Sequence, residues 1–156
     1  MNINLKSPIY AQIEITRACN HFCNHCYNSW RRDKSPSIAL EEYGLHHYEA
    51  ILDELISNEV FQLTLTGGEP VLKRKILPQI IEYAAGAGLD VSLNTNLSLL
   101  DKELIQDLRK SGLRSMLGSL ISADRKTQDI ISGVNGSFDR VVRGIEMVVS
   151  EGIGLG

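Results

Sequence analysis

The stretch Cys19-Asn-His-Phe-Cys23-Asn-His-Cys26 holds all three cysteines of the chain and follows closely on the run Ile9-Tyr-Ala-Gln-Ile-Glu-Ile-Thr16. Apolar and polar residues alternate along that run, which predicts a β-strand. Three thiols this close together in one loop favour metal binding over a disulfide framework. A four-iron cluster held by three cysteines leaves one iron open, and that iron can bind a small molecule carrying amino and carboxylate groups.

Outward from this loop, strand-like and helix-like segments alternate along the chain. We expect further strands over 60–66, 89–94 and 113–121, and helices over 38–57, 73–85 and 101–110. A fourth crossover is interrupted at Gly133-Val-Asn-Gly136, after which Ser137 is expected to cap a helix, as Asp101 does for the third helix. Residues 152–156 have the pattern of a fifth strand.

Strands that alternate with helices of this length form parallel sheets through right-handed crossovers, so the expected fold class is α/β, a partial (β/α) barrel with about four βα units. Four units cannot close a small barrel. We therefore expect residues 1–156 to be the N-terminal part of a longer core domain whose remaining barrel strands are missing here.

Polar residues recur at alternate positions of the expected strands, whereas strands buried on both faces are nearly continuously apolar. A barrel lumen around a polar small molecule explains this regularity, and an exposed or unusually polar sheet face is the alternative. The alternating residues are Gln12, Glu14, Thr16, Gln62, Thr64, Thr66, Ser92, Asn94, Asn96, Ser115 and Ser119.

Composition and charge exclude several classes of partner. The net charge of −3 and the pI near 5.8 show no excess of basic residues that would bind nucleic acid. The sequence has no secretory signal and no apolar run of about 18 residues, which predicts a cytoplasmic protein with no membrane partner.

The remaining candidate site residues follow the expected strands, at the sheet edge where parallel α/β folds bind ligands. Gly67 and Gly68 let the backbone approach a ligand closely, Glu69 offers a carboxylate to an ammonium group, and Pro70 stiffens the turn. Asn94, Asn96 and Ser119 lie at the ends of the next two strands.

The CxxxCxxC pattern of Cys19, Cys23 and Cys26, followed by Thr66-Gly-Gly-Glu-Pro70 at the end of the next strand, resembles the radical S-adenosylmethionine (radical SAM) superfamily. The resemblance implies that the three cysteines hold a 4Fe-4S cluster with one open iron and that S-adenosyl-L-methionine is the second cofactor. By the same resemblance, His25 would lie near the adenine and the Gly67-Gly-Glu-Pro70 turn would hold the methionine amino group. Asn94 and Asn96 would contact the ribose or the carboxylate.

The resemblance further implies an enzyme, an oxidoreductase that cleaves S-adenosyl-L-methionine reductively to a 5'-deoxyadenosyl radical with an electron donor such as flavodoxin or ferredoxin. Residues 119–145 are similar to the peptide-modifying branch that carries auxiliary clusters in a C-terminal SPASM or twitch domain. A peptide or protein substrate is therefore expected. The chain departs from that branch at Ser119-Leu-Ile-Ser122, where Ser-Leu-Asp-Gly is frequent, and at Ser132-Gly133, where Arg-Gly is frequent.

A non-catalytic metal-binding module is the alternative. Three cysteines with His21 or His25 make a Cys3His set, which is an accepted structural zinc site. A module that holds a cluster without catalysis belongs to the same alternative.

Overall fold

The computed structural model describes residues 7–28 and 43–156, and in it five parallel strands form one sheet in the order β1-β2-β3-β4-β5. The strands are β1 (Tyr10–Thr16), β2 (Gln62–Gly67), β3 (Asp90–Thr95), β4 (Ser115–Gly118) and β5 (Gly154–Leu155). The helices are α1 (Leu45–Ser57), α2 (Leu77–Gly86), α3 (Lys102–Lys110), α4 (Arg125–Ser132) and α5 (Ser137–Ser150), with a 3-10 turn at Pro70–Lys73. The expected α/β fold with four βα units is confirmed.

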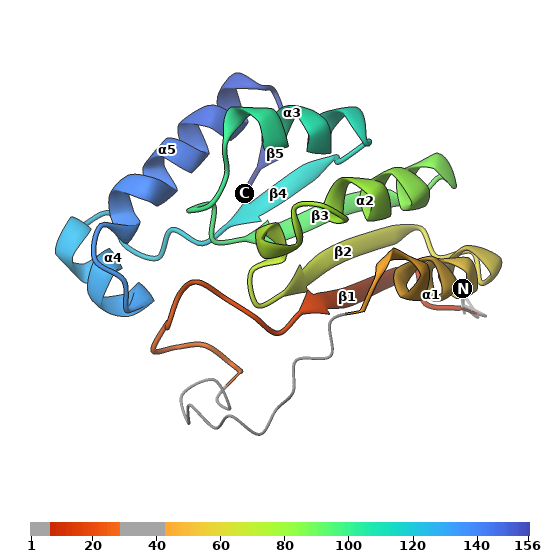
Figure 1. The fold of residues 1–156 in the computed structure, drawn as a ribbon, viewed down its shortest axis with the longest axis horizontal. Coiled ribbons are helices and arrows are strands. Elements are labelled where there is room, and N and C mark those ends of the chain that lie inside the picture. The colour runs from red at the N-terminus through yellow and green to blue at the C-terminus, as the bar shows by residue number, and fades with distance from the viewer. Residues whose placement is uncertain (1–6, 29–42) are drawn as a thin grey trace, which may run out of the picture.

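Strand order equals chain order, so every right-handed crossover returns on the same side of the sheet. Figure 1 shows α1, α2, α3 and α5 along that side, whereas α4 lies beyond the carboxyl ends of the strands, near the loop that follows β1. The core lies between the sheet and these helices. Its fully buried members include Leu52, Leu63, Leu65, Ile80, Ile81, Leu93, Ile105, Leu108, Val141 and Val148.

The opposite face of the sheet carries the polar residues that alternate along the sequence. Gln12, Glu14 and Gln62 are exposed there, and the hydroxyls of Thr64 and Ser92 form a hydrogen bond of 2.7 Å between β2 and β3. Among the described elements, no helix covers this face (Figure 1). Thr64 and Thr66 are themselves buried, so this face of the open sheet is polar, as the alternation predicts, but only partly exposed.

Two predicted helices begin later than expected. The helix predicted from residue 38 begins at Leu45, after Gly44 in extended conformation, and positions 38–42 lie outside the described residues. The helix predicted over 73–85 is divided into the 3-10 turn and α2. Pro78 is the reason, because proline is tolerated in the first helical turn but not further in, so α2 starts just before it.

Two further expectations were wrong, one at the end of β4 and one at the start of α5. The strand predicted over 113–121 ends at Gly118, because the backbone amides of Ile121 and Ser122 turn to the side chain of Gln128 in α4. Ser137 does not cap α5: Gly136 occupies the N-cap position, with φ of +71°. The carboxylate of Asp129 takes over the capping role by accepting hydrogen bonds from the amides of Gly136 and Phe138.

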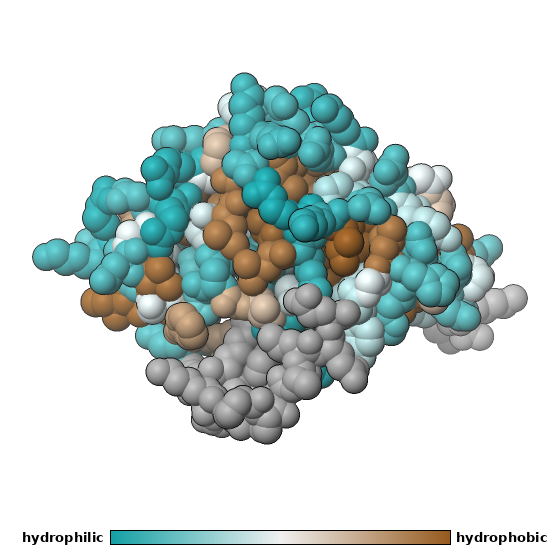
Figure 2. Space-filling model, in the orientation of Figure 1, coloured by the Kyte–Doolittle hydropathy of each residue, from teal (hydrophilic) through white to brown (hydrophobic). Residues whose placement is uncertain are grey.

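The surface is mainly hydrophilic in the orientation of Figure 2, with apolar residues gathered near its centre and over α4. Ile130 of α4 is an exposed apolar residue, with 72% of its surface accessible. Within the described part of the chain, none of the helices combines the length and apolar character that crossing a membrane requires.

Candidate functional site

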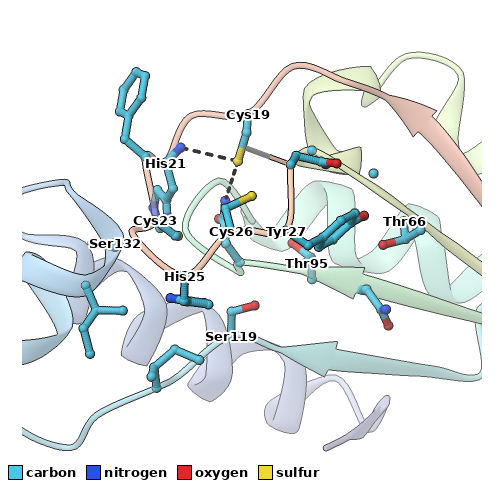
Figure 3. A pocket seen from close by; sticks show the side chains of 18 of the residues that line it. Cys19, His21, Cys23, His25, Cys26, Tyr27, Thr66, Thr95, Ser119 and Ser132 are labelled. Atoms are coloured by element: carbon cyan, nitrogen blue, oxygen red, sulfur yellow. Dashed lines mark hydrogen bonds between the residues drawn. The ribbon is translucent and has the colours of Figure 1, made fainter. Parts of the chain in front are cut away.

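A cavity of about 550 Å³ opens at the carboxyl ends of the strands, where the cysteine loop, the β2 turn, the end of β3 and the β4–α4 segment meet (Figure 3). This volume lies in the range of small-molecule sites. The predicted site residues that line it are Cys19, Cys23, His25, Cys26, Thr66, Gly67, Gly68, Asn94, Asn96 and Ser119. The structure thus brings ten of the predicted residues to one place, although they are up to 100 positions apart in sequence.

The three cysteines lie on one loop beside the cavity, and each is partly exposed (Figure 3). Two N–H groups point at the sulfur of Cys19: the backbone amide of His21 at 3.5 Å and the side-chain amide of Asn96 at 3.9 Å. N–H donors to a cysteine sulfur stabilise its thiolate and tune the potential of a metal centre bound to it.

The turn after β2 is fastened to the start of the cysteine loop. The backbone amides of Gly68 and Glu69 donate to the carbonyl oxygens of Thr16 and Ala18, at 2.7 and 2.8 Å. Gly67 has φ of +131°, and a Cβ placed on it would lie 2.3 Å from the Thr16 carbonyl oxygen. Only glycine fits there, so this glycine serves the contact between two strands as well as the cavity wall.

Glu69 lies between the turn after β2 and the end of β3. Its side chain is fully buried and does not line the cavity, and neither does Pro70. One carboxylate oxygen accepts hydrogen bonds from the Val71 amide (3.1 Å) and the Thr95 hydroxyl (2.7 Å), and the other accepts from the Asn96 amide (2.7 Å). The carboxylate joins the β2 turn to the end of β3, and its predicted contact with a ligand ammonium stays a prediction.

Asn96 links the end of β3 to the cysteine loop. Its side-chain amide donates to Asn20 at 2.8 Å, and its carbonyl oxygen accepts from the hydroxyl and the backbone amide of Ser98 at 2.7 and 3.0 Å. Asn20 in turn donates to the Ser98 hydroxyl at 2.9 Å. This network holds Asn96 while it lines the cavity, and the sequence had given no sign of Asn20 or Ser98.

Of the two histidines in the cysteine loop, His25 is exposed and His21 is 4% exposed. Both line the cavity, and the Nε2 atom of His21 has no hydrogen-bond partner within the described structure. Burial, followed by the nearby positive charge of Arg140, lowers the pKa of His21, which keeps its imidazole neutral at pH 7. From the sequence, His21 is a candidate only as a zinc ligand. No periodicity in the sequence marks a residue that is buried inside a short loop.

Ser119 lines the cavity from the segment between β4 and α4, and that segment is held by Gln128. The buried Oε1 atom of Gln128 accepts the amides of Ile121 and Ser122 at 2.9 and 3.1 Å. Gln128 also borders the cavity, together with Leu117 and Ile121. Gln128 was not among the residues predicted from the sequence. Its side chain reaches the 121–122 segment only because α4 folds over the end of β4.

Three cysteine thiols are the donor set that a cluster with one open iron requires. Among residues 7–28 and 43–156, no group of three or more His, Cys, Asp or Glu side chains gathers closely enough to hold one metal ion, so the Cys3His zinc site is not formed there. A cubane cluster instead binds each thiolate through a different iron and needs the sulfurs spread around it. The three cysteines lie on one loop beside an open cavity.

The chain thus combines a parallel α/β sheet, a three-cysteine loop after the first strand and a glycine turn after the second. The chain belongs to the Radical SAM superfamily, whose family profile matches residues 13–155. The resemblance inferred from the two motifs is confirmed.

Curated relatives extend this result. The chain is 34% identical over 152 residues to the Fe-coproporphyrin III synthase of Methanosarcina barkeri, covering 97% of the chain and 36% of that protein. It is 31% identical over 149 residues to the mycofactocin maturase MftC of Mycolicibacterium smegmatis, covering 95% of the chain and 36% of that protein. The chain therefore spans about a third of the length of the curated relatives that it matches.

Among solved structures, SuiB of Streptococcus suis bound to the precursor peptide SuiA superposes with a TM-score of 0.78 at 22% identity. The match covers 96% of this chain and 32% of SuiB. The partial-barrel fold is thereby supported independently of the sequence motifs.

Proposed function

We propose that this chain forms the cluster- and cofactor-binding part of a radical SAM enzyme that modifies a peptide or protein. The observation that carries the proposal is the meeting of the Cys19, Cys23 and Cys26 loop with the Gly67-Gly68 turn at one cavity, in a chain that belongs to the superfamily. A relative named as a mycofactocin maturase and the likeness to SuiB bound to its precursor peptide support the substrate class.

In this proposal the three thiolates hold a 4Fe-4S cluster with one open iron, and S-adenosyl-L-methionine occupies the cavity. When bound and reduced, the cluster supplies the electron that breaks a carbon–sulfur bond of S-adenosyl-L-methionine and yields methionine and a 5'-deoxyadenosyl radical. The residues proposed to contact this cofactor are His25, Thr66, Gly67, Gly68, Asn94, Asn96 and Ser119, all of which line the cavity.

Glu69 and Pro70 act on the cofactor site indirectly in this proposal. Glu69 fixes the backbone of the glycine turn and of Asn96, which lets both present polar groups to a ligand without rearrangement. Such pre-organisation, together with the exclusion of water, is what the protein contributes to reactions of a highly reactive intermediate.

The proposal includes the whole protein. We infer an oxidoreductase that works in the cytoplasm with an external electron donor such as flavodoxin or ferredoxin, and without nucleic-acid or membrane partners. We further propose that residues 1–156 belong to a larger core domain with additional barrel strands and an auxiliary-cluster domain. The length of the relatives, about three times the matched part, supports that organisation.

Anaerobic reconstitution with iron and sulfide tests the proposal. We expect about four irons and four sulfides per chain, and release of 5'-deoxyadenosine from S-adenosyl-L-methionine on reduction. The variant Cys23→Ala should bind no intact cluster, whereas His46→Ala, on the exposed surface of α1, should bind it normally. Stoichiometric zinc with no iron–sulfur cluster would contradict the proposal and support the zinc module.

A further inference from the structure

The cysteine loop lies against the C-terminal end of α4, and backbone hydrogen bonds join the two. The amide of Phe22 donates to the carbonyl oxygen of Ser132 at 2.9 Å, and the amide of Asn24 donates to that of Ile131 at 3.0 Å. Carbonyl groups in the last turn of a helix have no partner within the helix and are therefore available to such donors. Figure 3 shows the same arrangement, with Ser132 beside Cys23.

The two donors flank Cys23, the middle cysteine, on either side. The side chains of Phe22 and Asn24 are themselves exposed, the former by 68%, so burial of these side chains does little to hold this part of the loop. The bonds to α4 hold the backbone on both sides of Cys23.

Gly133 makes this contact possible. It is the C-cap of α4 with φ of +68°, and a Cβ on it would lie 2.8 Å from the carbonyl oxygen of Phe22 and 3.1 Å from its Cβ. Glycine is thus required twice, for the left-handed conformation and for the close approach of the loop.

The turn that contains Gly133 is itself held from both sides. Asp129 of α4 accepts the amides of Gly136 at 2.6 Å and Phe138 at 2.9 Å, and so ties the turn to the first residues of α5. α5 packs on the sheet through the fully buried Val141 and Val148. The sheet, α5, the turn and the loop form a continuous chain of contacts that ends at Cys23.

We propose that the end of α4, with Gly133 at its centre, is a positioning element that holds the cysteine loop in the conformation that binds the cluster. This inference rests on the proposed function only in taking the cysteines as cluster ligands. Gly133 touches no reacting atom; it acts through the backbone around Cys23.

The test compares Gly133→Ala with Gly152→Ala. Gly152 also follows a helix with a left-handed φ of +73°, but nothing lies within 4 Å of a Cβ placed on it, so its variant carries the backbone strain without the collision. Hydrogen exchange of the Phe22 and Asn24 amides is measured in the metal-free protein, and loss of iron to a chelator is measured after reconstitution.

We expect Gly133→Ala to speed both the exchange of these amides and the loss of iron about tenfold or more, because loss of the two hydrogen bonds removes an opening penalty of that order. Gly152→Ala should leave both rates as in the unchanged protein. Equal rates in the two variants would overturn the proposal. If the unchanged protein takes up no cluster, the proposed function fails instead, and the exchange rates still report on the loop.

Asp129→Asn is a second variant for the case in which Gly133→Ala does not fold. It places an amide N–H₂ where one oxygen now accepts a backbone amide, so the turn loosens while Gly133 and the loop sequence stay unchanged. Faster exchange at Phe22 and Asn24 in this variant supports the positioning role, and unchanged exchange contradicts it.

Discussion

The carboxylate of Glu69 accepts the backbone amide of Asn96 at 2.7 Å, which joins the turn after β2 to the end of β3 across 27 positions of sequence. Both carboxylate oxygens are engaged and the side chain is fully buried. The hydrogen bonds of Glu69 therefore connect the ends of two neighbouring strands.

Replacing Glu69 by Gln should lower the free energy of unfolding by about 2 kcal/mol, because the new amide N–H₂ faces a buried donor that loses its acceptor. Urea denaturation measures the change. Glu82→Gln, on the exposed face of α2, is the matched control and should have no measurable effect. A stable Glu69→Gln protein would show that the buried carboxylate is dispensable.

Gly67→Ala should destabilise the protein by about 3 kcal/mol or more, because the added Cβ collides with the Thr16 carbonyl oxygen at an unfavourable φ. Gly88→Ala has a comparable positive φ of +95° with open space around the Cβ, and should cost about 1 kcal/mol. Denaturation of the two variants side by side separates collision from strain. Equal losses would mean that β1 moves aside without cost.

Tyr48→Phe should cost about 1 to 2 kcal/mol, because the buried Tyr48 hydroxyl donates to the Ile15 carbonyl oxygen at 2.6 Å and so ties α1 to β1. Tyr83→Phe removes a hydrogen bond of the same length to Asp53 on the surface and should cost less than about 0.5 kcal/mol. Thermal or urea unfolding measures both. A reversed order would contradict the importance of burial here.

Asp101 caps α3 by accepting the amide of Leu104 at 2.9 Å, and this hydrogen bond, with Arg74 adding to it, lowers the pKa of the Asp101 carboxyl. A carboxyl with a lowered pKa stabilises the fold above its unfolded value of about 3.9, and that stabilisation is lost as the pH falls through the folded pKa. Asp101→Ala should therefore cost about 1 kcal/mol at pH 7 and less in acid.

Asp101→Asn is the control for this pH dependence, since asparagine also caps helices but does not titrate. Urea midpoints between about pH 2.5 and pH 7 are the measurement. The difference between the unchanged protein and the Asn variant should shrink as the pH falls. A difference that grows in acid would contradict the assignment.

The sequence predicts much of this fold because each element depends on local pattern. The alternation from Ile9 to Thr16 and the cap at Asp101 are properties of a few neighbouring residues, and both expectations were confirmed. Where two residues could cap the same helix, their contacts in the folded structure decided which one does. Ser137 is a good capping residue by type, yet Asp129, eight positions earlier, supplies the acceptor instead.

The sequence by itself determined the superfamily, the three cysteines and the sheet edge where the site lies, because the spacing of thiols and glycines and the periodicity of strands are written in consecutive residues. Only the tertiary structure decided that Glu69 is buried and connects two strand ends, and that His21 rather than His25 is buried. It also decided that the end of α4 holds the backbone around Cys23. These are contacts between segments far apart in the chain, and their partners are selected by packing, which no local pattern records.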